Sequence, residues 1–292
     1  MSADQDLRKG CHSLVTGIHT SYGYAPTTSA GIVFCILFRL STISHIIQLG
    51  RSKVWWCIVF VVGGLVEIIG WAGRTWSSQC PYNSTAFLMQ ISTLIIAPVF
   101  FTAGVYIILG RLIQVFGRNC SILRPSLYLW IFCTCDVISL VVQAVGGGLA
   151  SSEVNKINGN TDPGTNIMVA GIVFQLASMS VFVALAIDFL IRSTRQGILK
   201  SRKQSSIPIL SSMTLSLLCI YLRSIYRTIE LSQGWTGYLI THERYFITLD
   251  GAMMVIAVGV FNFIHPATFL PRSPAEDNGE WLDITRRPGS RK

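Results

Sequence analysis

Ionisable side chains that could bind a charged group gather between Arg223 and Asp250. Arg223, Arg227 and Glu230 follow one another at i, i+4 and i+7, a spacing that puts all three on one face of a helix. Asp250 belongs to the next apolar run and is expected at a similar depth. We therefore predict an ion pair between Arg223 and Asp250. Acids and bases in this arrangement either hold two helices together or bind a charged ligand.

Two more acidic residues lie inside apolar runs. Glu67 shares a helix face with Gly70 and Arg74, and the small glycine lets another helix pack closely over the carboxyl group. Asp136 shares a face with Gln143 in the segment CDVISLVVQ. A charge at mid-membrane costs about 2.5–3.5 kcal/mol when it faces lipid. We therefore expect Asp136 to face the inside of a helix bundle.

The composition indicates that membrane-spanning helices position these side chains. Of the 292 residues, 51% are hydrophobic and 13% are charged, and the mean hydropathy is +0.52. A soluble domain carries about 25% charged residues. The sequence therefore predicts an all-α polytopic membrane protein, a bundle of seven helices each long enough to cross a core of about 30 Å. The expected spans are residues 25–48, 54–74, 86–110, 126–150, 167–191, 208–230 and 245–270.

Lys and Arg are distributed unevenly between the two sides of this expected bundle. Fifteen lie in the segments after spans one, three and five and in the C-terminal tail, whereas five lie on the opposite side. Because basic residues concentrate in the cytosol, we expect the N-terminus outside and the C-terminus in the cytosol. The expected organisation is an extracellular segment (1–24), a transmembrane domain (25–270) and a disordered basic cytosolic tail (271–292).

The sequence lacks the motifs of several enzyme classes. It contains no GxxxxGK[ST] nucleotide loop, no HExxH zinc motif and no GxSxG nucleophile turn. All six lysines lie outside the expected spans, which excludes a retinal-type Schiff base inside the bundle. We therefore expect no enzymatic activity, no catalytic residue, no metal and no cofactor. Nucleotides and nucleic acids are not expected as partners.

Two features of the expected outside segments concern covalent modification. Cys11 and Cys80 would both face an oxidising compartment, where they either form a disulfide or remain free. Asn83-Ser84-Thr85 fits the sequon for N-glycosylation. An unused match close to the membrane is the alternative for Asn83.

Eight polar residues of four expected spans form the candidate substrate-binding and translocation site. They are Glu67, Arg74, Asp136, Gln143, Arg223, Arg227, Glu230 and Asp250. All except Asp136 fall in the outer half of the membrane, where they could line one polar vestibule. Two alternatives stay open: a Glu67–Arg74 pair that only fixes packing, and Arg227 and Glu230 side chains that extend to the membrane interface. His45 and His265 are expected at the opposite interface without a functional role.

Short motifs between residues 22 and 270 resemble those of one known family. They are YGYAP at 22–26, AGVYIILGR at 103–111, DVISL at 136–140 with GGG at 146–148, RSIYR at 223–227 and HP at 265–266. By these motifs the chain resembles the fungal lipid-translocating exporters, seven-span proteins linked to 7-aminocholesterol resistance and sphingoid-base release. Arg39 departs from the pattern, since an apolar or small residue is expected there. The resemblance implies movement or release of amphipathic lipids.

The leading hypothesis is a translocator of a sphingoid long-chain base or a similar amphiphile, which confers resistance to toxic lipids and sterol analogues. Glu67, Asp136 and Asp250 would attract the cationic amine, and Arg223 and Arg227 would balance these acids or bind a phosphate. Without a nucleotide site, transport would be facilitated or ion-coupled through Asp136 or Glu67. The expected location is the plasma membrane, with the vacuole or endoplasmic reticulum as alternatives.

A receptor or stress sensor without transport activity is the second hypothesis. Seven spans, an outside N-terminus and a basic cytosolic face fit that class equally well. The sequence has Gly110-Arg111-Leu112 in place of a DRY motif and lacks NPxxY in the last span. An intramembrane enzyme is the third hypothesis.

Overall fold

A computed structural model describes residues 10–12, 20, 22–117, 120–154, 160–196, 203–234 and 237–270. Within these ranges the regular structure is entirely helical. The predicted cytosolic tail (271–292) lies outside the described residues, as does most of the predicted extracellular segment (1–24).

Seven helical segments of the described chain are long and apolar enough to cross a membrane. The helices are α2 (Thr28–Ser52), α3 (Ile58–Gln79, after the 3-10 turn η1, Trp55–Cys57), α4 (Ser84–Phe116), α5 (Pro125–Val154), α6 (Asp162–Arg195) and α8 (Lys203–Ser232). The last span consists of α9 (Glu243–Tyr245), the π-helical segment η3 (Phe246–Ala252) and α10 (Met253–Phe263), and the short helix α11 (Pro266–Phe269) follows it. The predicted all-α, seven-helix membrane fold is confirmed.

The last span ends earlier than the sequence predicted. Helix α10 stops at Phe263, whereas the expected span continued to residue 270. Pro266 explains the difference, because the residue before a proline is disfavoured in helical conformation. His265 accordingly adopts an extended conformation (ψ 128°) and caps α11.

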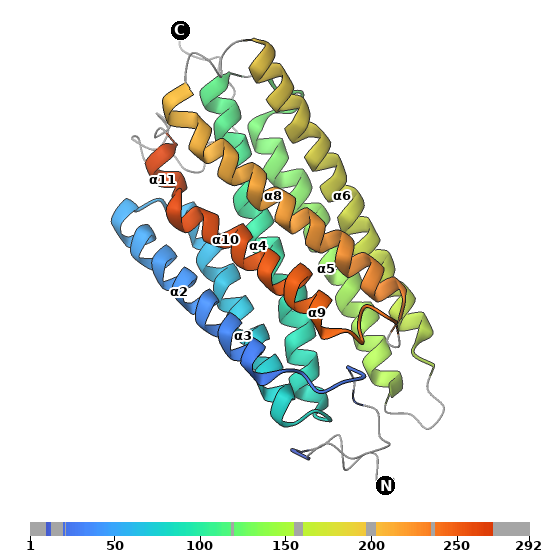
Figure 1. Cartoon of the computed structure of the whole chain (residues 1–292). Helices are drawn as coiled ribbons and strands as arrows, with labels where there is room; N and C mark the ends of the chain where they lie inside the picture. Colours follow the sequence, from blue (N-terminus) through green and yellow to red (C-terminus); the bar gives the residue numbers. More distant parts are fainter. Residues whose placement is uncertain are drawn as a thin grey trace.

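The contacts between the seven spans follow the order of the chain around a ring. Figure 1 shows the spans lying side by side in one bundle. Each helix packs on the one before and the one after it, and α10 closes the ring against α2. Helix α4 also contacts α8 across the ring. Figure 1 shows α9 and the start of α2 at one end of the bundle, and α11 and the end of α2 at the other.

Glycines allow the closest helix contacts. A Cβ atom on Gly63 of α3 would come within 2.6 Å of the Phe101 ring of α4. Gly146 of α5 packs directly on the α6 backbone at Gly164 and Met168, whereas a Cβ on Gly148 would meet nothing within 4 Å. The first glycine of the GGG run is therefore a packing position, and the last is open.

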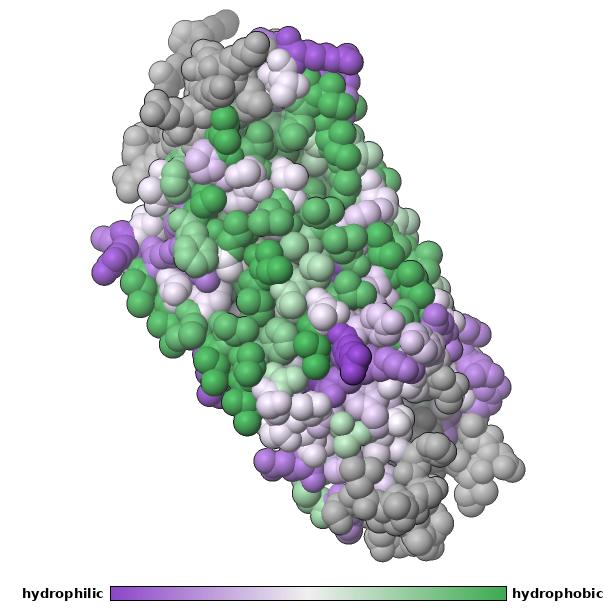
Figure 2. All heavy atoms as spheres, in the orientation of Figure 1, coloured by the Kyte–Doolittle hydropathy of each residue, from purple (hydrophilic) through white to green (hydrophobic). Residues whose placement is uncertain are grey.

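The outer surface of the bundle is apolar, as contact with lipid requires. Large hydrophobic side chains such as Leu40, Val141, Val181 and Leu218 are more than half exposed. Figure 2 shows a broad hydrophobic region over the middle of the bundle, with hydrophilic residues gathered toward its ends. The side of the membrane that each end faces remains a prediction.

Candidate site: a polar cavity inside the helix bundle

A polar cavity lies between α4, α5, α6 and α8. Its polar lining consists of Thr102, Asp136, Gln143, Gln175, Arg223, Ser224 and Arg227, and its apolar wall of Ile95, Pro98, Ile172, Leu176, Met179 and Ile220. The cavity volume is about 30 Å³, whereas small-molecule sites typically measure several hundred Å³. In this conformation it has room for part of a head group but not for a whole lipid.

Asp136 is the acidic residue of the cavity wall. It is 1% exposed, and its Oδ2 accepts hydrogen bonds from Thr102 Oγ1 (3.2 Å) and from the Tyr106 hydroxyl (3.0 Å). Within the described part of the chain, no basic side chain pairs with it. Its hydrogen-bond partners there are neutral hydroxyl groups on one oxygen, which leaves Oδ1 for a ligand. The expectation that Asp136 faces the bundle interior is confirmed.

Two amide side chains face each other across the same cavity. Gln143 Nε2 on α5 donates to Gln175 Oε1 on α6 at 3.0 Å. Each amide keeps further donor and acceptor capacity beyond this bond. The pair can therefore bind hydroxyl groups of a head group.

Pro98 explains the position of Arg223. Proline has no backbone N–H, so the Leu94 carbonyl one turn earlier loses its helix partner. Arg223 Nη2 donates to this carbonyl oxygen at 2.6 Å. Arg223 Nε also lies 2.9 Å from Asp250 Oδ1 as an ion pair, without the alignment of a hydrogen bond. The predicted Arg223–Asp250 pair is confirmed, and it joins α8 to the last span.

Asp250 occupies an irregular part of the last span. It lies in the π-helical segment η3, a type of turn that occurs frequently at functional sites. The wider turn separates Asp250 from the regular helix α10. Sequence periodicity does not reveal such a turn, and it was not predicted.

Arg227 and Glu230 form a second buried pair. Arg227 Nη1 lies 2.8 Å from Glu230 Oε2, and the Tyr226 hydroxyl donates to Glu230 Oε1 at 2.8 Å. Arg227 is 7% exposed and Glu230 is 2% exposed, so the alternative that they extend to the membrane interface is wrong. Arg227 Nη2 has no hydrogen-bond partner among the described residues.

Glu67 lies behind the Arg223–Asp250 pair rather than in the cavity wall. It is 1% exposed, and its charged neighbours are Arg223, Asp250 and Arg227. Its Oε1 has no hydrogen-bond partner among the described residues. The alternative of a Glu67–Arg74 pair is wrong, because Arg74 pairs elsewhere.

Arg74 belongs to a cluster at the end of the bundle where α2 begins. Its Nη2 lies 2.7 Å from Glu243 Oε1 and donates to the Tyr24 hydroxyl at 2.9 Å. Its guanidinium carbon lies 4.3 Å from the centroid of the Phe246 ring. Glu243 also accepts hydrogen bonds from Thr27 N (2.8 Å) and Thr27 Oγ1 (2.6 Å). We call Tyr24, Thr27, Arg74 and Glu243 the outer latch, after the side of the membrane that the sequence predicts for this end of the bundle.

The eight predicted residues therefore do not line one vestibule. Asp136, Gln143, Arg223 and Arg227 line the cavity. Three acids lie behind the arginines, and Arg74 lies in the outer latch. The three acids are Glu67, Glu230 and Asp250.

Four polar residues of the cavity region were not predicted: Thr102, Tyr106, Gln175 and Ser224. Thr102 and Tyr106 follow Pro98 at i+4 and i+8, so one polar face of α4 starts at the proline. That spacing would have pointed to them. Gln175 carried no comparable signal.

His45 is buried between α2 and α3. It is 2% exposed and stacks on Phe60 with 5.4 Å between ring centroids, and its location near the membrane interface stays a prediction. Beside it, Gln48 Nε2 donates to the Asn262 carbonyl at 2.7 Å, and Asn262 Nδ2 donates to Ser41 Oγ at 2.7 Å. These contacts join α2 to α10.

Among the described residues, no three His, Cys, Asp or Glu side chains group into a metal site.

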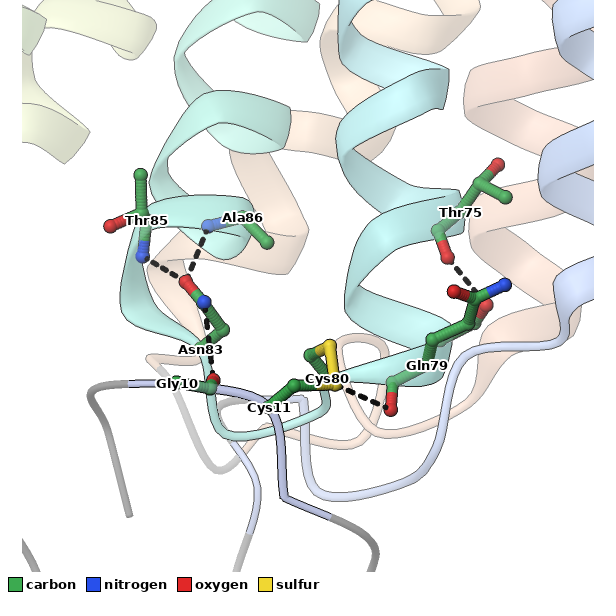
Figure 3. Close-up of a disulfide and its surroundings, with 9 residues drawn as sticks. Gly10, Cys11, Thr75, Gln79, Cys80, Asn83, Thr85 and Ala86 are labelled. Carbon is green, nitrogen blue, oxygen red and sulfur yellow. Dashed lines mark hydrogen bonds between the residues drawn. A yellow bond between two sulfur atoms is a disulfide. The ribbon is translucent and has the colours of Figure 1, made fainter. Parts of the chain in front are cut away.

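Cys11 and Cys80 are joined as a disulfide in the structure (Figure 3). Nearby, Asn83 caps α4, because its Oδ1 accepts from the backbone N–H groups of Thr85 (2.9 Å) and Ala86 (3.1 Å). Asn83 Nδ2, the atom to which a glycan would attach, donates to the Gly10 carbonyl at 3.3 Å. Glycosylation of Asn83 and formation of the disulfide in the cell stay predictions.

Comparison with known proteins gives the family. Residues 60–273 match the RTA1-like proteins. The chain belongs to the RTA1-like family. This RTA1-like protein is 35% identical to the sphingoid long-chain base transporter RSB1 of Saccharomyces cerevisiae (strain Lalvin EC1118 / Prise de mousse), over 90% of this chain and 79% of the relative.

Two further relatives from Saccharomyces cerevisiae (strain ATCC 204508 / S288c) carry different names. Protoporphyrin uptake protein 1 is 28% identical, over 82% of this chain and 90% of the relative. Protein RTA1 is 26% identical, over 84% of each chain. No solved structure matches this RTA1-like chain.

Proposed function

We propose that this protein moves amphipathic lipids with a cationic amine head group, of the sphingoid long-chain base type, between the two leaflets of the membrane. Such transport would protect the cell from toxic lipids and sterol analogues. One observation carries the proposal: Asp136 lines the cavity without a basic partner among the described residues. The relative named as a sphingoid long-chain base transporter supports the same class of substrate.

We assign different roles to the polar groups of the cavity. Oδ1 of Asp136 binds the ammonium group. Thr102 and Tyr106 donate hydrogen bonds to Oδ2 and so orient the carboxyl group. The amides of Gln143 and Gln175 bind hydroxyl groups of the head group. The two cavity arginines balance Asp250 and Glu230 and therefore leave Asp136 as the site for a cation.

The hydrocarbon tail stays outside this small cavity. Helices α6 and α8 pack less extensively on each other than α5 and α6 do. The apolar side chains of Ile172, Leu176 and Ile220 border the cavity on these helices. A head group can therefore enter between α6 and α8 while its tail remains in the lipid.

Reconstitution into liposomes tests the proposal. The rate at which a fluorescent sphingoid base redistributes between leaflets is measured for wild type and for Asp136→Asn. A hydrogen bond to a charged group contributes about 1.5–3 kcal/mol, so the variant is expected to be roughly 10- to 100-fold slower. Asp188→Asn is the matched control, since Asp188 pairs with Arg192 on the surface of α6, with side chains 33% and 44% exposed. Normal transport by Asp136→Asn would overturn the proposal.

Substrate class is tested in the same vesicles. An N-acetylated sphingoid base has the same tail but no positive charge, and it is expected to move much more slowly than the free base. A porphyrin dicarboxylate serves as the anionic comparison, because one relative is named for protoporphyrin uptake. Equal rates for the charged and the acetylated base would contradict the assignment of Asp136 as the amine site.

Cells provide a test of protection and location. We propose the plasma membrane as the site of action, and a fluorescent fusion is expected at the cell surface. Cells that lack the protein are expected to be hypersensitive to added sphingoid base. Wild type should restore growth, whereas Asp136→Asn should not.

A further inference from the structure

Glu67 is a buried carboxyl group that the head-group site does not use. It is 1% exposed, it does not line the cavity, and its Oε1 has no partner among the described residues. On α4, Phe101 packs at the glycine one turn before it, and Leu94 and Thr93 pack at the glycine one turn after it. Glu67 is therefore a buried carboxyl group whose charged neighbours are Arg223, Asp250 and Arg227.

The charges next to Glu67 are already matched without it. Arg223 pairs with Asp250 (2.9 Å) and Arg227 pairs with Glu230 (2.8 Å). Glu67 is thus a third carboxyl beside two cations. With a proton on Glu67 the cluster is neutral, whereas loss of that proton leaves one negative charge at a buried position, which is strongly unfavourable unless a cation moves toward it.

Arg223 is the cation best placed to respond. It is a charged neighbour of Glu67, it touches Asp250, and it lines the cavity. Its Nη2 also holds the Leu94 carbonyl that Pro98 leaves free. A shift of this guanidinium from Asp250 toward Glu67 therefore changes the cavity wall and releases α4 at its proline.

We propose that Glu67 is the proton-binding site that couples lipid movement to a proton gradient, through exchange of Arg223 between Asp250 and Glu67. This inference rests on the proposed function. The structure shows Arg223 paired with Asp250, and we assign this arrangement to the protonated state of Glu67. When the carboxyl gives its proton to a water molecule that reaches it from the cavity, Arg223 turns to the new carboxylate. Asp250 then keeps Arg227, whose Nε lies 3.8 Å from its Oδ1, as its cation. The Trp71 indole N–H, one turn along α3 and close to the Glu67 carboxyl group, supplies a second donor to the carboxylate. One proton is taken up and released in each cycle.

The test measures protons and lipid in the same proteoliposomes. A pH-sensitive dye inside the vesicles reports proton movement when sphingoid base is added outside, and an imposed pH difference tests accumulation. For one proton per lipid, a difference of one pH unit supports at most about a tenfold ratio of lipid between the leaflets. Wild type is expected to approach this ratio, and Glu67→Gln is expected to move lipid without accumulation and without proton movement.

Two controls distinguish proton coupling from passive partitioning of the lipid. Sphingoid bases are weak bases that follow a pH difference by themselves, so protein-free vesicles give the background and an N-trimethylated base, which cannot lose a proton, repeats the measurement. Asp188→Asn on the surface of α6 is expected to behave like wild type. Glu67→Asp keeps an ionisable group and is expected to retain coupling with an altered pH profile.

The outcomes separate the two proposals. Lipid movement by wild type without proton movement would overturn the coupling and leave the proposed function standing. If Glu67→Gln accumulates as much lipid as wild type under the pH difference, the coupling is likewise overturned and the proposed function stands. If Glu67→Gln does not fold, the wild-type proton signal and Glu67→Asp decide the question. Absence of any lipid movement by wild type would overturn the proposed function itself.

Discussion

Neutral hydroxyl and carbonyl groups form hydrogen bonds to two of the buried charged side chains. Asp136 relies on Thr102 and Tyr106, and Arg223 relies on the Leu94 carbonyl in addition to Asp250. Neutral partners of this kind orient a charged group without cancelling its charge. Asp136 therefore remains able to bind a cation, whereas Arg223 is matched by a carboxylate.

Tyr106→Phe tests how Asp136 is positioned. The substitution removes one of the two hydrogen bonds to Oδ2 and keeps the ring, so we expect about tenfold slower sphingoid-base transport at limiting substrate. Tyr128→Phe is the matched control: this equally buried ring loses a hydroxyl contact to Ser121 (2.9 Å) that is remote from Asp136. Redistribution rates in liposomes and thermal unfolding in detergent are measured for both. Equal losses in the two variants would show that the Tyr106 hydroxyl only supports packing.

The sequence predicted which charges would be buried better than it predicted their partners. A carboxyl group in an apolar run must face the bundle interior, so Asp136 could be placed from its position alone. The Arg223–Asp250 pair followed from a similar depth on adjacent spans. A Glu67–Arg74 pair on one helix was one of the alternatives, but Arg74 pairs with Glu243 of the last span. The partner of Arg74 depends on which face of α3 packs against the last span, and local sequence patterns do not carry that information.

Helix α4 is the element on which the cavity depends. It contacts α8 across the ring, and Pro98, Thr102 and Tyr106 follow one another along its polar face. The seven spans could be predicted because length and hydropathy fix them. The π-helical turn of η3 and the end of α10 at Phe263 could not be predicted from hydropathy, since both depend on backbone geometry inside apolar sequence.

Pro98→Ala tests whether the irregular part of α4 is needed for transport. Alanine restores an N–H that can donate to the Leu94 carbonyl and so competes with Arg223. We expect unchanged or higher thermal stability, by up to about 3 kcal/mol, together with slower transport. Pro208→Ala in α8 is the control, because Pro208 also lies inside a helix but does not line the cavity. Higher stability of Pro98→Ala with normal transport would contradict a role for the proline in movement.

The whole bundle is closed at one end by contacts between distant parts of the chain. The outer latch joins the start of α2 to α3 and to the last span. Tyr22 adds a further link, since its hydroxyl donates to Gln90 Oε1 at 2.7 Å. Burial raises the pKa of Tyr22 to about 12, so the hydroxyl keeps its proton and continues to donate at physiological pH. The closed latch agrees with the small volume of the cavity, because a lipid head group needs at least one end or one side of the bundle to open.

The disulfide provides a test of how the whole molecule lies in the membrane. If the latch faces the outside, as the distribution of Lys and Arg predicts, Cys11 and Cys80 meet an oxidising compartment and stay paired. A membrane-impermeant maleimide added to intact cells is then expected to label them only after reduction. The free cysteines among the described residues are buried or half-buried, so their background labelling is low. Arg51→Cys, exposed at the opposite end of α2, is the control and should react only in inverted vesicles. If Cys11 and Cys80 react instead from the cytosolic side, the predicted orientation is reversed, and the outer latch faces the cytosol.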